Sequence, residues 1–172
     1  FLVSAPILMG ANHGPLNEQG EVWRLITAMF LHGGLMHLFF NGYALFVLGR
    51  PTEGLYGWGW MLTMYTAAGL GGNVVSWLGG VFAFPAVQLG ASGAIFGLIG
   101  MGIVHCWRHR WVNQALLRNL LMWAGLSLAF GFVIGADNWA HVGGLAVGAG
   151  LAWLLPAEKV TKRGPMQTLG KV

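Results

Sequence analysis

The sequence predicts an all-α polytopic membrane protein whose helices pack as a bundle. Hydrophobic residues fill 56% of its 172 positions and charged residues only 8%, against about 25% charged residues in a soluble domain. The apolar residues gather in five segments, each close to the roughly 20 residues that a helix needs to cross a bilayer. These predicted spans are residues 31–49, 58–78, 92–107, 115–134 and 139–155.

The first 30 residues precede these spans. Their opening stretch, FLVSAPILMG, is shorter than a bilayer requires and lacks the positive flank of a signal peptide. We therefore expect a further span upstream of Phe1, so that the chain contributes five spans of a six-span protein. Residues 1–172 then form a single transmembrane domain, in which 1–30 is an outer loop and 156–172 is a cytoplasmic tail.

Glycine occurs 29 times, mostly within the predicted spans, and this indicates helix backbones that approach one another closely. The third span contains one GxxxG pair, Gly93 and Gly97, and the fifth contains another, Gly144 and Gly148. Cys106 is the single cysteine and lies in an apolar run, so its expected role is buried packing. The glycines therefore predict close packing between helices.

The basic residues predict the orientation of the spans. Five alternating spans place eight of the nine basic residues on one side, in or beside the links and the tail. Positive residues mark the cytoplasmic side of a membrane protein, so only Arg24 lies on the outer side. The eight are Arg50, Arg108, Arg110, Arg118, Lys159, Lys162, Arg163 and Lys171.

Three polar side chains share one predicted depth in the spans that descend to the cytoplasm. His37, Ser92 and His141 precede charged residues at the cytoplasmic boundary by 13, 16 and 17 positions, which is roughly 20 to 26 Å at the helical rise. A histidine inside a span is costly in lipid and tends to face a protein interior or a wet cavity. Interhelical hydrogen bonding is the structural alternative for either histidine.

A serine at a helix start and a histidine at the same depth are the minimum parts of a nucleophile and its general base. Acyl transfer also needs donors for the oxyanion that forms. His37 and Asn41, four residues apart in HLFFN, share a helix face, and the backbone N–H of Ser92 is a third donor. Gly90 and Gly93 flank the serine with minimal bulk, so a substrate carbonyl can approach it.

Four segments occur in order between residues 21 and 148: EVWR, HGGLMHLFFN, GASGAIFG and AHVGGLAVG. In these segments the chain resembles the bacterial rhomboid intramembrane serine proteases. The resemblance implies a bundle of six helices that cuts transmembrane segments of other proteins near the outer face of the bilayer. It implies a dyad of Ser92 and His141 without an acidic member, with His37 and Asn41 stabilising the oxyanion.

The resemblance also implies supporting residues. His32 and the pair Trp23 and Arg24 become structural parts of the outer loop and its junction with the next span. Phe96 stands where family members often carry a tyrosine that stacks on the catalytic histidine, so stacking is retained and the hydroxyl is lost. Glu53 is expected to support packing at the cytoplasmic end.

Two residues before the predicted base allow more than one interpretation. Asp137 lies four residues before His141 and could complete a triad, but an acid at a helix start is also a common partner of the helix dipole, which we favour. Asn138 is expected to help fix the outer loop. Substrate entry is expected to be gated by span 115–134 and the outer loop before residue 139.

Other classes of protein fit the sequence less well. The HExxH pattern of zinc proteases is missing, so neither a metal nor another cofactor is expected. Despite a net charge of +4, no basic run is interleaved with aromatic residues, which argues against nucleic acid. A transporter or channel, and a catalytically silent protein that binds membrane helices, stay open as alternatives. The oligomeric state and the substrate stay open, and the expected partners are a substrate helix and the lipid of a bacterial inner membrane.

Overall fold

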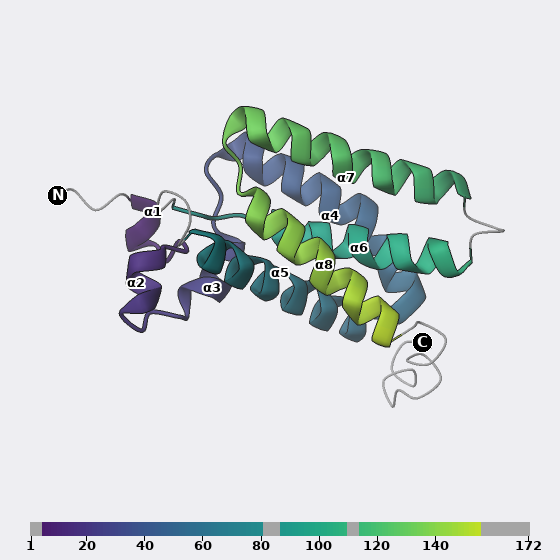
Figure 1. Cartoon of the computed structure of the whole chain (residues 1–172), viewed down its shortest axis with the longest axis horizontal. Helices are drawn as coiled ribbons and strands as arrows, with labels where there is room; N and C mark the ends of the chain where they lie inside the picture. The colour runs from purple at the N-terminus through teal and green to yellow at the C-terminus, as the bar shows by residue number, and fades with distance from the viewer. Residues whose placement is uncertain (1–4, 81–86, 110–113, 156–172) are drawn as a thin grey trace.

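The computed structural model describes residues 5–80, 87–109 and 114–155, in which all regular structure is helical apart from an isolated bridge between Asn12 and Gln88 (Figure 1). Short elements gather at the end of the molecule nearest the N-terminus. They are α1 (Ala5–Leu8), α2 (Gly14–Glu18), α3 (Arg24–Thr27) and the 3-10 turn η1 (Ala28–Phe30). The long helices are α4 (Leu35–Tyr56), α5 (Trp58–Gly80), α6 (Ser92–Arg108), α7 (Gln114–Ile134) and α8 (Asn138–Leu154). The helical bundle predicted from the sequence is confirmed.

Helix α6 is the centre of the bundle, in contact with α4, α5, α7 and α8. Every residue from Gly93 to Met101 is buried, and the glycines in this stretch let α5 and α8 approach its backbone closely. Cys106 is also fully buried, as expected. Packing against the neighbouring helices fixes the position of α6, and therefore of Ser92 at its first residue.

Glycines bring α6 and α8 into backbone contact. A Cβ atom placed on Gly144 would strike the carbonyl oxygen of Gly93, and one placed on Gly148 would strike the carbonyl oxygen of Gly97. The reverse relation holds one turn further along, where a Cβ on Gly100 would strike the carbonyl oxygen of Leu145. The predicted close approach of helices is therefore observed between the third and fifth predicted spans.

Helix α4 extends further than the sequence predicted. It continues to Tyr56 through Pro51, although residues 50–57 were expected to form a link. Pro51 cannot donate a hydrogen bond to the preceding turn, but the Thr52 hydroxyl donates to the Leu48 carbonyl (2.8 Å) beside it. The helix ends at Gly57, whose φ of +79° is open to glycine and costly for other residues.

By length and mean hydropathy, one helix of the described residues, α7, is suited to crossing a membrane. The segments Arg24–Phe30 and Leu35–Tyr56, which meet at 93°, pass the same test as a joined pair. Helices α6 and α8 have 17 residues each, about 25 Å of rise, so both fall short of a hydrocarbon core of about 30 Å. The count of five spans stays a prediction.

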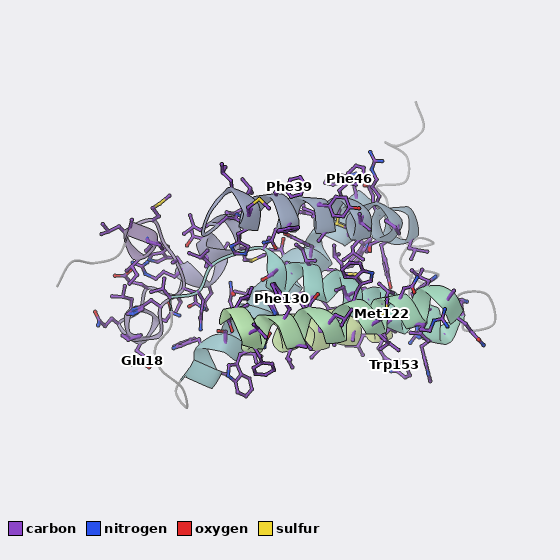
Figure 2. All side chains as sticks on the ribbon, turned by 90° about the horizontal axis from the view of Figure 1, so that it is seen from above. Glu18, Phe39, Phe46, Met122, Phe130 and Trp153 are labelled. Carbon is purple, nitrogen blue, oxygen red and sulfur yellow. The ribbon has the colours of Figure 1, made fainter. Side chains whose placement is uncertain are left out.

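Large apolar side chains cover the outward faces of α4 and α7. Figure 2 labels Phe39 and Phe46 on α4 and Met122 and Phe130 on α7, and each of the four is more than half exposed. A surface of this kind suits contact with lipid chains or with another apolar helix. The predicted boundary residue Arg110 and the predicted tail, 156–172, lie outside the described residues.

Candidate active site

Ser92 and His141 meet where α6 and α8 begin. The Oγ atom of Ser92, the first residue of α6, lies 2.8 Å from Nε2 of His141, in the first turn of α8. His141 is 7% exposed, so few other partners compete for its ring. A hydroxyl and an imidazole nitrogen at this distance form a hydrogen bond that can pass a proton.

Gly90 shapes the approach to the serine. Its φ of +124° lies in the region that favours glycine, and its N–H donates to the Ala28 carbonyl (2.9 Å), which ties this loop to η1. A Cβ atom on Gly90 would lie 2.8 Å from Cε1 of His37 and 3.9 Å from Ser92 Oγ. The glycine therefore lets the His37 ring lie against the loop that leads into Ser92, whereas the sequence suggested that its small size serves the approach of a substrate carbonyl.

Phe96 holds one face of the histidine ring. The two rings are stacked, with centroids 4.4 Å apart and planes inclined by 10°, and Phe96 is buried. Phe96 lies one helical turn after Ser92, so the helix that carries Ser92 also restricts the rotation of the His141 ring. The stacking expected at this position does not require a phenol hydroxyl.

The protonation of His37 follows from its backbone partner. The Gly33 N–H donates to Nδ1 of His37 (3.2 Å), so the hydrogen of the neutral ring is on Nε2, the atom near Gly90. Asn41 is buried, and its side-chain amide donates to the His37 carbonyl (2.9 Å). At least one of its two amide hydrogens thus points along its own helix, whereas the sequence suggested that both side chains are directed at one point.

The residues before His141 divide two roles between them. Asp137 caps α8 by accepting from the Ala140 N–H (3.0 Å) and also accepts from the Ser76 hydroxyl (2.5 Å), which is the capping role favoured above over a triad. Asn138 contacts both α7 and the ring of His141, and its expected role in fixing the outer loop stays a prediction. Its Oδ1 lies 3.2 Å from Nδ1 of His141, and its Nδ2 donates to the Leu128 carbonyl of α7 (3.1 Å).

Comparison with known proteins shows which family the chain belongs to. Residues 19–158 match the family described as "Rhomboid domain", which is most of the chain and includes Ser92 and His141. This chain belongs to the rhomboid family. Rhomboid proteins are integral membrane proteins, which agrees with the composition of the chain.

Curated relatives support the assignment over most of this chain. It is 39% identical over 144 residues to "Rhomboid protease GluP" of Bacillus subtilis (strain 168), covering 83% of this chain and 28% of the relative. It is 37% identical over 150 residues to "RHOMBOID-like protein 5" of Arabidopsis thaliana, with coverages of 86% and 48%. It is 34% identical over 158 residues to "Rhomboid-like protease 1" of Toxoplasma gondii, with coverages of 87% and 52%. The chain thus spans between about a quarter and about half of these relatives.

The end of this rhomboid domain that contains α1, α2 and α3 is organised around Arg24. Its guanidinium is buried, forms an ion pair with Glu21 (2.6 Å) and donates to the carbonyls of Ile7 (2.6 Å) and Ala11 (3.2 Å). Its charge also lies over the ring of Trp23, 4.6 Å from the centroid. One side chain therefore holds together α1, α3 and the segments between them, in agreement with a structural role for both residues.

His32 lies beside the His37 ring, edge to face, with centroids 5.1 Å apart. Its Nε2 is buried and has no hydrogen-bond partner among the described residues. Glu53, expected to support packing, is instead exposed, and its backbone carbonyl accepts from the Gly57 N–H (2.7 Å). Within the described parts of the rhomboid domain, no three His, Cys, Asp or Glu side chains lie close enough to hold a metal ion.

Proposed function

We propose that this rhomboid domain is a serine endopeptidase that cleaves transmembrane segments near the outer face of the bilayer. Ser92 Oγ attacks the peptide carbonyl while Nε2 of His141 accepts its proton, and His141 then protonates the leaving amine. Water entering from the outer face hydrolyses the acyl-enzyme with His141 again as base. The observation that carries the proposal is the 2.8 Å contact between Ser92 and His141 at the start of a buried helix.

Donors around the serine support stabilisation of the oxyanion. The Nε2–H of His37 lies on the Gly90 side, because Gly33 occupies its other nitrogen. Asn41 has a second amide hydrogen besides the one donated to His37. The Ser92 N–H, at the N-terminus of α6, supplies a third donor. Fixed donors of this kind contribute about 10²- to 10³-fold each to the rate of acyl transfer.

A substrate helix is proposed to reach the serine from the side of α7. Both α4 and α7 pack on α6 and expose apolar side chains, so an apolar segment can lie against them without uncovering polar groups. We infer a preference for small residues at the cut from the cramped glycine loop before Ser92. From the basic residues we infer that the C-terminus is cytoplasmic, and from the resemblance to bacterial rhomboids we infer a multi-pass protein of a bacterial inner membrane.

Cleavage of a model transmembrane substrate in liposomes tests this proposal. The parent, Ser92→Ala and His141→Ala are compared at equal folded concentration. We expect each variant to lose at least about 10³-fold in kcat. Serine and histidine act as one unit, so removing either of them lowers the rate nearly as much as removing both. A serine-directed phosphonate should label the parent and not Ser92→Ala, which reports the nucleophile without a peptide substrate.

Matched controls come from the same helices. Ser127→Ala changes a half-buried serine of α7, and His109→Ala changes a histidine just beyond the opposite end of α6; both should cut like the parent. Full activity in Ser92→Ala would contradict the mechanism. A folded parent that binds transmembrane peptides without cutting any would favour the silent binding protein, and solute flux into the liposomes would favour the transporter.

A further inference from the structure

The Asn138 side chain links α7, beside which the substrate is proposed to enter, to His141 of α8, the proposed general base. Its Nδ2 donates to the Leu128 backbone carbonyl in α7, the helix beside which substrate is proposed to enter. Its Oδ1 lies 3.2 Å from Nδ1 of His141, the nitrogen that faces away from the serine. One amide group thus lies between the backbone of α7 and the base.

The Leu128 carbonyl determines which way this amide points. A carbonyl oxygen can only accept hydrogen bonds, so the NH₂ group of Asn138 faces α7 and its oxygen faces His141. An amide oxygen is also only an acceptor, and Nδ1 of His141 must therefore carry the hydrogen. In the neutral ring this leaves the Nε2 lone pair free to accept from Ser92 Oγ at 2.8 Å. The tautomer needed for catalysis follows from a backbone group of another helix.

Helix α7 is shaped to receive the amide. A Cβ atom on Gly131 would strike Oδ1 of Asn138 and would lie 3.2 Å from its Cγ. Gly131 is buried, and its carbonyl accepts from the Ala136 N–H (2.8 Å), which folds the connection into α8 back onto α7. Phe96 covers the ring of His141 by stacking. The imidazole is therefore held by a face contact from α6 and by an in-plane hydrogen bond that depends on α7.

We infer that Asn138 is a positioning residue through which α7 sets the tautomer and the placement of the catalytic base. The inference rests on the proposed function, since it concerns the same dyad. When α7 lies against α8, the Leu128 carbonyl orients the amide and the base is competent. When α7 moves away, the amide loses that partner, its two orientations become equivalent and the hydrogen of His141 redistributes between Nδ1 and Nε2. Cleavage is therefore coupled to the return of α7 after substrate entry.

Kinetics of three variants test the coupling in the full chain. Asn138→Leu keeps the size of the side chain and removes both hydrogen bonds, and Gly131→Ala disturbs the amide from α7. We expect each to lower kcat about tenfold, the effect of one neutral hydrogen bond, with KM little changed. The control is Gly125→Ala on the same helix, where a Cβ atom meets nothing within 4 Å, and it should leave kcat as in the parent.

The tautomer itself gives a readout that a merely structural role would not move. The ¹⁵N resonances of the His141 ring are recorded in a Ser92→Ala background, at a pH where the ring is neutral, and are assigned by their loss in His141→Gln. We expect a protonated Nδ1 with Asn138 present and a mixture of tautomers in Asn138→Leu. Asn138→Asp offers an acceptor to Nδ1–H and no donor to Leu128, so it should keep the tautomer while losing the link to α7.

The possible outcomes separate the inference from the proposed function. Two results would overturn the inference even if Ser92 and His141 prove essential. One is a kcat like that of the parent in Asn138→Leu and Gly131→Ala, and the other is a His141 tautomer that is the same in Asn138→Leu as in the protein with Asn138. If the His141 tautomer changes in Asn138→Leu but the parent never cleaves a substrate, the link to α7 is supported and the proposed proteolysis is refuted. If Asn138→Leu does not fold, Gly131→Ala carries the same comparison of kcat and of the tautomer.

Discussion

Replacing Gly144 by alanine should separate the two halves of the proposed dyad. The new Cβ atom would strike the Gly93 carbonyl oxygen and would lie 2.7 Å from the Gly93 carbonyl carbon. Carbon atoms without a bond between them are stable at about 3.5 Å or more, so α8 must move from α6 by about 0.8 Å. Ser92 is the neighbour of Gly93, and a displacement of that size along the line from its Oγ to Nε2 of His141 would lengthen their contact from 2.8 Å to about 3.6 Å, beyond a hydrogen bond.

The expected effects are large in both activity and stability. A displacement of about 1 Å at a catalytic contact costs on the order of 10²-fold in rate, and an overpacked interior costs about 1–3 kcal/mol in the free energy of unfolding. Cleavage of a model transmembrane substrate gives kcat, and thermal unfolding in detergent gives Tm.

The matched control for this prediction is Gly150→Ala in the same helix. A Cβ atom there meets nothing within 4 Å, and alanine is a better helix former than glycine by up to about 1 kcal/mol. Gly150→Ala should therefore keep kcat and keep or raise Tm. If Gly144→Ala behaved like Gly150→Ala in both measurements, the argument from backbone contact between α6 and α8 would be refuted.

Substitutions at three further positions give independent checks. Gly90→Ala places a Cβ atom at a φ of +124° and against the His37 ring. We therefore expect a loss of about 1–3 kcal/mol in the free energy of unfolding and at least a tenfold lower kcat. A kcat like that of the parent would contradict the placement of His37. Phe96→Leu removes ring stacking worth about 0.5–1.5 kcal/mol and should lower kcat several-fold, whereas Phe96→Tyr keeps the stack and should not. Arg24→Lys loses hydrogen bonds to the Glu21 carboxylate and to two backbone carbonyls, and it should destabilise the fold by about 1.5–3 kcal/mol. We expect a lower Tm, with phosphonate labelling of Ser92 retained at low temperature. An unchanged Tm would contradict the structural role of Arg24.

Several features of the site could be read from the order of residues along the chain. Helix α6 begins at Ser92, as the change from a glycine loop to an apolar run predicted. The GxxxG pairs predicted helix contact, and their glycines do meet between α6 and α8. These predictions succeeded because small residues and helix starts act locally, whatever the rest of the fold.

Other features escaped prediction because they depend on partners distant in the sequence. The sequence placed a link at 50–57, but the helix continues past Pro51 to Tyr56, which is buried in a cluster with Leu98 and Ala152 from two other helices. Asp137 proved to contact Ser76, 61 residues away, and not the ring of His141. No periodicity or motif records such a pairing, since it depends on how far each helix is rotated about its axis.

The sequence by itself determined the helical bundle, the family and the residue types brought together at the site. The tertiary structure alone decided their hydrogen-bonding states. Gly33 assigns the hydrogen of His37 to Nε2, and the Leu128 carbonyl, acting through Asn138, assigns that of His141 to Nδ1. The physical reason is that an imidazole or an amide has two nearly equivalent arrangements, and only the donor or acceptor that faces it in the folded protein selects between them.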